Sequence, residues 1–270
     1  MAGTMPRSEV SCSGPESRRA TAAPSFAGRR GHHRGVSSTP VPVLHVGTSG
    51  FSYDEWRPSF YPDDLKKDAM LSFYAERLPA VELNNTFYRL PTAKMTAKWR
   101  RAVPDAFRFV VKASQRLTWT QKLVDCGELL GVMFAALEPL GASLGAVFYQ
   151  VPKWVRKDVA VLRDFLALQP RSTKVAFEFA HPSWADEEVR DTLRRHDVAV
   201  VASDKDDAPP PAIVDTSTWT YLRLRRAAYS DAELRGWRDR LLARGGEAFV
   251  FFKHEDSGAG PALARRFREL

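Results

Sequence analysis

Short apolar runs alternate with longer amphipathic stretches along the chain from residue 43 onward. Each run is five or six residues long and is mostly unbroken by polar residues, which is typical of parallel strands covered on both faces. Strands of this kind require a helix or similar crossover between them. The pattern predicts eight strands: Val43–Thr48, Ala80–Asn84, Phe107–Lys112, Ala146–Gln150, Lys174–Glu178, Val198–Ser203, Trp219–Arg223 and Ala248–Phe252.

The stretches between these runs repeat apolar residues every three or four positions. Leu234, Trp237 and Leu241 are one example, and such spacing places the side chains on one stripe of a helix. The pattern predicts helices over 65–77, 127–138, 156–168, 185–195, 231–243 and 259–270. The segment 206–217 differs because it contains three consecutive prolines, and we expect a loop there.

Eight strands that alternate with helices indicate an α/β fold. Their number, within residues 43–270, favours a single (β/α)8 domain of the TIM-barrel type over an open sheet. A doubly wound sheet is the alternative. Its dinucleotide-binding version is unsupported, because no Gly-x-Gly-x-x-Gly sequence follows the first strand.

Residues 1–42 have a different composition, rich in Ser, Arg, Gly, Pro and Ala. Phe26 is the only aromatic residue up to residue 40, so little apolar surface is available to offset the entropy of ordering. We expect a disordered basic tail, either a genuine extension or an upstream reading of the start codon. The tail carries half of the net charge of +8, and the remaining +4 is ordinary for a soluble domain.

Other sequence features narrow the class of protein. No apolar run approaches the ~20 residues that a bilayer span needs, so we expect a soluble, cytoplasmic protein without a membrane partner. The two cysteines, Cys12 and Cys126, form neither a metal-binding spacing nor a disulfide framework. No motif identifies a cofactor.

Candidate chemistry lies at the ends of the predicted strands, where barrel enzymes place their active sites. Glu82, Lys112, Gln150, Glu178 and Arg223 lie within or end apolar runs. Burying an unpaired charge costs several kcal/mol, so these groups form either an internal ion network or a polar ligand pocket. The candidate catalytic residues are Glu82, Lys112, Glu178 and Asp204, and the candidate binding residues are Thr48, Asn84, Thr86, Tyr88, Gln150, His181 and Arg223.

Several motifs occur in the order known from one family. They include GTSGFSY at 47–53, VELNNTFYR at 81–89 and EFAHPSW at 178–184. On these motifs, residues 43 to about 265 resemble the YecE-like family of domain of unknown function 72. The resemblance implies a (β/α)8-type barrel but no particular reaction. It also implies a shared pocket: Glu82, Asn84, Thr86, Tyr88, Lys112, Gln150, Glu178, His181 and Asp204.

Three functions remain open from the residues. The first is an enzyme or binding barrel for a small polar or anionic metabolite, in which Lys112, Arg223 and Arg225 hold a carboxylate or phosphate. Glu82 or Glu178 then serves as general acid or base, and a two-carboxylate glycosidase is one variant.

The second function is a divalent-metal barrel, resembling sugar isomerases or endonucleases by fold analogy alone. Glu82, Glu178, Asp204, His181 and His254 are ligand types suited to such a site, although no tight metal-binding spacing is present. The third is a non-enzymatic nucleic-acid-binding protein that uses the basic surface. The residues alone do not separate an enzyme from a binding protein.

Overall fold

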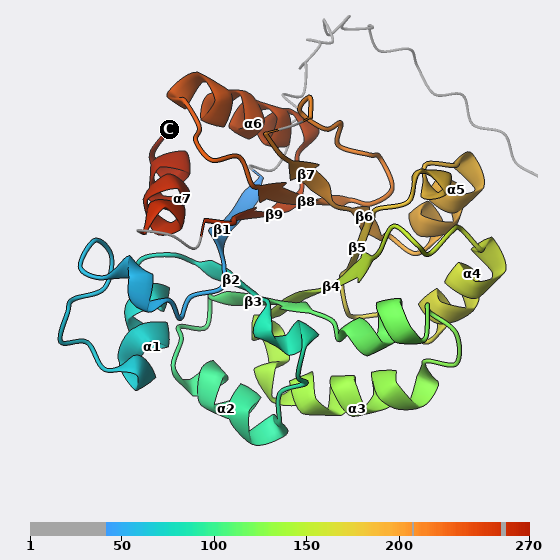
Figure 1. Ribbon diagram of the computed structural model, residues 1–270, viewed down its shortest axis with the longest axis horizontal. Helices are drawn as coiled ribbons and strands as arrows, with labels where there is room; N and C mark the ends of the chain where they lie inside the picture. Colours follow the sequence, from blue (N-terminus) through green and yellow to red (C-terminus); the bar gives the residue numbers. More distant parts are fainter. Residues whose placement is uncertain (1–41, 207, 255–257) are drawn as a thin grey trace, which may run out of the picture. The chain divides into compact units, whose positions relative to one another are not determined.

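The computed structural model describes residues 42–206, 208–254 and 258–270 (Figure 1), so the predicted tail lies almost wholly outside the described residues. The described part contains nine strands, all paired in parallel. They are β1 (Val43–Ser49), β2 (Ala80–Leu83), β3 (Arg108–Lys112), β4 (Leu144–Val151), β5 (Val175–Phe179), β6 (Ala199–Val200), β7 (Ala202–Asp204), β8 (Trp219–Leu224) and β9 (Glu247–Phe252).

The strands follow the order β6-β5-β4-β3-β2-β1-β9-β8-β7. Only Val201 separates β6 from β7, and β6 pairs with β5 while β7 pairs with β8. One stretch of chain therefore contacts both ends of the sheet, and the barrel is nearly closed. The predicted fold is confirmed, with the sixth predicted strand divided in two.

The helices surround the barrel (Figure 1). They are α1 (Met70–Ala75), α2 (Ala93–Arg101), α3 (Gly127–Leu137), α4 (Val159–Ala167), α5 (Glu187–Arg195), α6 (Asp231–Arg244) and α7 (Ala259–Glu269). No helix in the described ranges is long and apolar enough to cross a membrane. The described residues of 206–217 form no helix, as expected from the prolines.

Helix α2 is not predicted by the apolar spacing. Four of its nine residues are Lys or Arg, and Thr96 is its one buried residue. A hydroxyl anchors the helix instead, because Thr96 Oγ1 donates to the carbonyl oxygen of Ala136 in α3 at 2.7 Å. Its first turn is capped by Thr92, whose side chain accepts from the Met95 amide. Trp99 of α2 also packs against the core, with its ring centroid 6.4 Å from that of Phe109, so this polar contact supplements a narrow apolar face.

The alternation of side chains along each strand determines which groups reach the barrel interior. A buried apolar cluster that includes Ala80, Val110, Ala176 and Tyr221 fills the interior. The residues two positions further along these strands point to the same side, and they are Glu82, Lys112, Glu178 and Arg223. The barrel interior is thus apolar along the middle of the strands and charged at their carboxyl ends.

Candidate functional site

Glu82 is fully buried at the end of β2 and accepts hydrogen bonds from three side chains. Ser49 Oγ donates to Oε1 at 2.6 Å and Tyr221 OH donates to Oε2 at 2.5 Å. Arg223 Nη2 lies 2.9 Å from Oε1. Tyr221 and Arg223 belong to β8, which is not a neighbour of β2 in the sheet, so these contacts cross the barrel interior.

Arg223 joins Glu82 to a second carboxylate. Its Nη1 lies 3.1 Å from Glu178 Oε2, and Gln150 Nε2 donates to the same oxygen at 2.7 Å. The Arg223 guanidinium also lies over the ring of Phe148, 5.0 Å from its centroid. We call Glu82, Lys112, Gln150, Glu178, Tyr221 and Arg223 the mouth cluster. The structure thus contains the internal ion network that the sequence allows, formed by Glu82, Arg223 and Glu178.

Both carboxylates of the mouth cluster are held in the ionised form. Burial by itself raises the pKa of Glu82, but Arg223, Ser49 and Tyr221 outweigh it and hold that pKa below its usual value. Burial likewise opposes ionisation of Glu178, whose pKa is lowered chiefly by Arg223 and then by Arg225. Neither carboxylate is therefore a proton donor at neutral pH in this state.

Lys112 is the unusual member of the mouth cluster. Its Nζ lies over the Phe87 ring, 4.1 Å from the centroid, and 5.8 Å from that of Phe148. Within the described residues, no carboxylate lies within 4.0 Å of this nitrogen. Burial, and then the positive charge of Arg223, lower the pKa of Lys112 to about 8, although Glu82 and Glu178 oppose the shift. The side chain is half-buried, so solvent reaches it.

Three predicted binding residues lie in the turn that follows β2. Thr86 Oγ1 donates to the carbonyl oxygens of Leu83 and Lys112, at 2.8 and 2.7 Å, and so ties this turn to β3. Asn84 Oδ1 is buried and has no hydrogen-bond partner among the described groups. Tyr88 is 76 % exposed and packs edge-on against Phe87. The turn therefore positions Phe87 beneath the Lys112 amine.

Thr48 and His181 each fix local backbone. Thr48 Oγ1 donates to the Gly50 carbonyl oxygen at 2.6 Å and contacts Tyr74 OH. His181 Nδ1 accepts from the Ser183 amide at 3.0 Å and caps the short helix η6 (Pro182–Trp184). Their observed contacts are structural.

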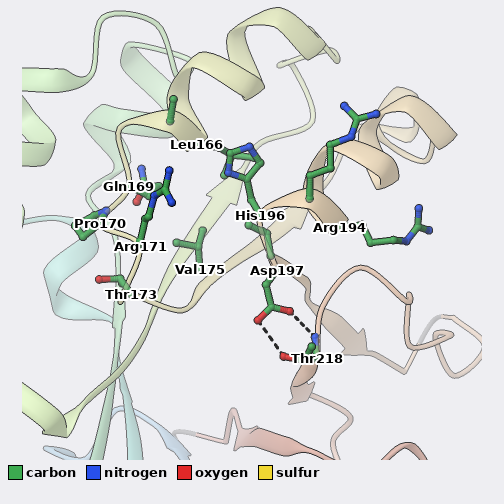
Figure 2. A pocket seen from close by; sticks show the side chains of 13 residues that line it. Leu166, Gln169, Pro170, Arg171, Thr173, Val175, Arg194, His196, Asp197 and Thr218 are labelled. Carbon is green, nitrogen blue, oxygen red and sulfur yellow. Dashed lines mark hydrogen bonds between the residues drawn. The ribbon is translucent and has the colours of Figure 1, made fainter. Parts of the chain in front are cut away.

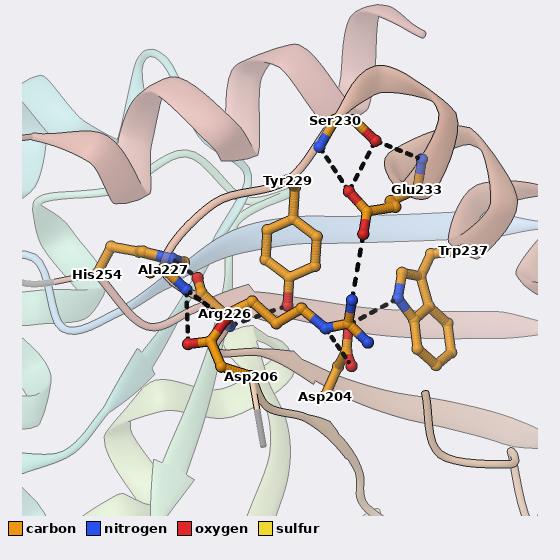
Figure 3. A network of polar contacts seen from close by, with 9 residues as sticks. All are labelled: Asp204, Asp206, Arg226, Ala227, Tyr229, Ser230, Glu233, Trp237 and His254. Carbon is orange, nitrogen blue, oxygen red and sulfur yellow. Dashed lines mark hydrogen bonds and ion pairs between the residues drawn. The ribbon is translucent and has the colours of Figure 1, made fainter. Parts of the chain in front are cut away.

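Asp204 lies outside the barrel wall, away from the other three candidate catalytic residues. In the β7–β8 pair, Ser203 aligns with the inward-facing Arg223, so Asp204 faces the opposite side. There its carboxylate accepts from Arg226 Nε at 2.9 Å and from Trp237 Nε1 of α6 at 3.1 Å (Figure 3). The structure therefore brings Glu82, Lys112 and Glu178 together and places Asp204 in a separate network.

The residues offered as metal ligands are likewise divided. Glu82 and Glu178 contact Arg223, whereas Asp204 and His181 bind groups elsewhere. Across residues 42–206, 208–254 and 258–270, no three His, Cys, Asp or Glu side chains form a group that can hold a metal ion.

Two residues that complete the site were not predicted from the sequence. They are Ser49 and Tyr221, whose hydroxyls donate to Glu82. Arg225, predicted to hold an anion, has its Nη1 3.8 Å from Glu178 Oε1. The available signal was the two-residue period of β8, which places Tyr221, Arg223 and Arg225 on one face.

A separate cavity of about 670 Å³ lies at the opposite, amino-terminal ends of the strands (Figure 2). It is lined by residues that precede β5, β6 and β8, among them Arg171, His196 and Thr218. Asp197 adopts a positive φ of 53° there, and its carboxylate accepts from the Thr218 amide at 2.5 Å and hydroxyl at 3.0 Å. The acid therefore fixes a turn at the stabilising end of the barrel.

Comparison with known proteins assigns the chain to a family. The model of the family described as "Protein of unknown function DUF72" matches residues 45–270. The chain belongs to the DUF72 family. A DUF72 family crystal structure from Thermotoga maritima is 28% identical, with a TM-score of 0.72, and the match covers 84% of this chain and 98% of that one. The resemblance stated from the sequence motifs is therefore confirmed.

A second DUF72 family structure has the same fold, and one curated protein matches in sequence. A structure from Enterococcus faecalis is 20% identical with a TM-score of 0.69, over 84% of this chain and 94% of that one. The UPF0759 protein YunF of Bacillus subtilis (strain 168) is 29% identical over 151 residues, which are 53% of this chain and 52% of YunF. The chain thus matches about half the length of that curated relative.

Proposed function

We propose that this DUF72 protein is an enzyme that binds a small anionic metabolite at the carboxyl-terminal mouth of the barrel, with Lys112 as its reacting group. The observation that carries the proposal is the Lys112 amine, which lies in a half-buried position on an aromatic ring without a carboxylate partner among the described residues. A pKa near 8 lets it gain or lose a proton close to neutral pH, as an acid–base catalyst must.

The charges around the mouth cluster favour an anion. In the described part of the chain, four cations belong to this cluster or act on it: Lys112, Lys205, Arg223 and Arg225. Two carboxylates, Glu82 and Glu178, oppose them, and both are already bound by Arg223. Positive charge therefore remains for a ligand that carries a carboxylate or phosphate.

The side chains divide into a rigid base and an accessible rim. Glu82, Arg223 and Tyr221 are almost completely buried and bind one another, so they hold their positions before a ligand arrives. Arg225 is 26% exposed and can offer its guanidinium to an anion in a bidentate manner. The ligand's anionic group therefore faces Arg225 while its reacting atom faces Lys112.

A thermal-shift screen tests this proposal. Phosphorylated and carboxylated metabolites are compared with neutral analogues of the same size. A ligand that binds only the folded protein stabilises it by about 2.7 kcal/mol at a hundred times its Kd, which gives a readily measured rise in Tm. We expect hits among the anions only.

The matched variants are Lys112→Met and Lys98→Met. Lys98 serves as the control because it lies on α2, is exposed, and pairs with Asp68 just before α1. We expect Lys112→Met to lose the shift and Lys98→Met to retain it. Equal shifts with anionic and neutral compounds, or a full shift in Lys112→Met, would contradict the proposal.

A further inference from the structure

We infer that Lys112 is a nucleophile that forms an imine with the carbonyl carbon of an aldehyde or ketone bearing a carboxylate or phosphate. The inference rests on the proposed function and names the substrate class of the same site. Its physical basis is the placement of the amine at the end of β3, over Phe87 and beside the Arg223 guanidinium.

The surroundings of Lys112 destabilise its ammonium form relative to that of an exposed lysine. Nucleophilic lysines are activated by desolvation or by a neighbouring cation, because both destabilise the ammonium form. Phe87 and Phe148 flank Nζ, and the charges of Arg223 and Lys253 act on it in addition. Both activating conditions are therefore present at one nitrogen.

Charge neutralisation does not account for this lysine. Glu82 has Arg223, Ser49 and Tyr221 as partners, and Glu178 has Arg223 and Gln150. Other lysines of the described chain do pair with acids: Lys67 with Asp54, Lys98 with Asp68, Lys157 with Asp186, and Lys174 with Glu247. Lys112 is placed differently: its Nζ lies over the Phe87 ring, and no acid among the described residues lies within ion-pair distance of it.

The reaction balances without an added oxidant or reductant. The neutral Nζ attacks the carbonyl carbon, a C–N bond forms, and the carbonyl electron pair moves to oxygen, which takes up a proton from nitrogen. The resulting carbinolamine loses the hydroxyl group and the second nitrogen proton as water, leaving a C=N bond. A primary amine and a carbonyl compound are thus converted into an imine and water.

Reductive trapping tests the inference. The full-length protein is incubated with glyoxylate, pyruvate or dihydroxyacetone phosphate in the presence of sodium cyanoborohydride, and adducts are located by peptide mass mapping. We expect Lys112 to react at least about tenfold faster than exposed lysines at pH 7.5, since more of it is unprotonated. The rate should rise as the pH increases through about 8 and level off above that value, while Glu82, Glu178 and Arg223 keep their charge.

Two controls distinguish a specific binding site for the anionic carbonyl compound from an amine that is reactive without such a site. Lys112→Arg keeps the positive charge but cannot form the adduct, whereas Lys98→Arg should label like the wild type. Arg225→Met should slow labelling by glyoxylate without slowing labelling by propionaldehyde, which has no anionic group.

Labelling of Lys112 no faster than that of Lys98 with all three carbonyl compounds overturns the imine. If anions still raise the Tm in that case, the proposed function is retained and only the imine is excluded. If no anion raises Tm, the proposed function itself fails.

Discussion

Removal of the Arg223 guanidinium should be one of the most damaging single changes in the barrel. The substitution Arg223→Met retains a long apolar side chain beside Phe148 but removes the cation that binds both Glu82, at 2.9 Å, and Glu178, at 3.1 Å. Glu82 is fully buried and Glu178 is 9% exposed, so water does not replace the lost partner effectively.

The expected loss follows from the energetics of buried ion pairs. Removing one partner of such a pair costs about 3–5 kcal/mol, because the other charge is left buried and uncompensated. That cost compares with a total stability of about 5–15 kcal/mol for a folded domain. Arg190→Met is the matched control, since the Arg190–Glu187 pair is exposed and should contribute about 0–1 kcal/mol.

The loss should depend on pH in a defined direction. In the wild type, the lowered pKa values of both acids add stability above the ordinary Glu value of about 4.3, and this contribution is lost as pH falls. Without Arg223, burial raises these pKa values, so the variant loses stability as pH rises through the same region. The difference between the two proteins should therefore be full at pH 7 and shrink as pH falls towards 4. It should become small only below the ordinary Glu value, where the acids of the wild type take up protons.

Urea denaturation at pH 4, 5, 6 and 7, followed by circular dichroism, measures this difference. The double variant Glu82→Gln with Arg223→Met completes a cycle that isolates the coupling between the two side chains. A loss below about 1 kcal/mol at pH 7, or one that does not change with pH, would refute the description of a buried, ionised Glu82–Arg223–Glu178 network.

Three further predictions concern neighbouring features. Folding disfavours the ammonium form of Lys112, so the free energy of unfolding of the wild type should rise between pH 8 and about 10.4. Urea titrations of Lys112→Met should lack this rise. The same change of stability with pH in both proteins would contradict the lowered pKa. Asp204→Asn should lower the free energy of unfolding by about 1–3 kcal/mol, because it removes the charge that Arg226 Nε binds, although Arg226 keeps its pair with Glu233. It should leave the Kd of anions unchanged, and a weakened Kd would show that Asp204 belongs to the site. Gly47→Ala should lower the free energy of unfolding by about 1–3 kcal/mol or more, because its Cβ would lie 1.8 Å from a β2 carbonyl oxygen. Gly131→Ala, in an open part of α3, should raise it by roughly 0.5–1 kcal/mol. Equal Tm values for the two alanine variants would argue against the close approach of β1 and β2.

The barrel could be predicted because its strands are covered on both faces and read as unbroken apolar runs. The division of the sixth strand at Val201 could not, because it depends on which neighbour each half pairs with. Helix α2 was not predicted for a different reason: four of its nine residues are Lys or Arg, and its buried residue is Thr96, whose hydroxyl bonds to α3 beside the apolar contact of Trp99.

The candidate site was predictable in part. Glu82, Lys112 and Glu178 interrupt apolar runs at strand ends, and this unusual placement identified them. Asp204 also follows a strand, but the β7–β8 register places it on the other face, one residue from the inward-facing Ser203. Strand patterns do not contain the distances across the barrel. They therefore could not show which acids Arg223 binds, or that a ring and not a carboxylate lies beneath Lys112.

Calorimetric titration of the strongest anionic hit into the wild type, Lys112→Met and Asp204→Asn tests the central claim most directly, because it compares an inward-facing with an outward-facing strand-end residue. We predict that Lys112→Met weakens binding at least about tenfold, which corresponds to about 1.4 kcal/mol, while Asp204→Asn binds as the wild type does. Unchanged binding by Lys112→Met, or equal weakening in both variants, would contradict a ligand site at the mouth cluster.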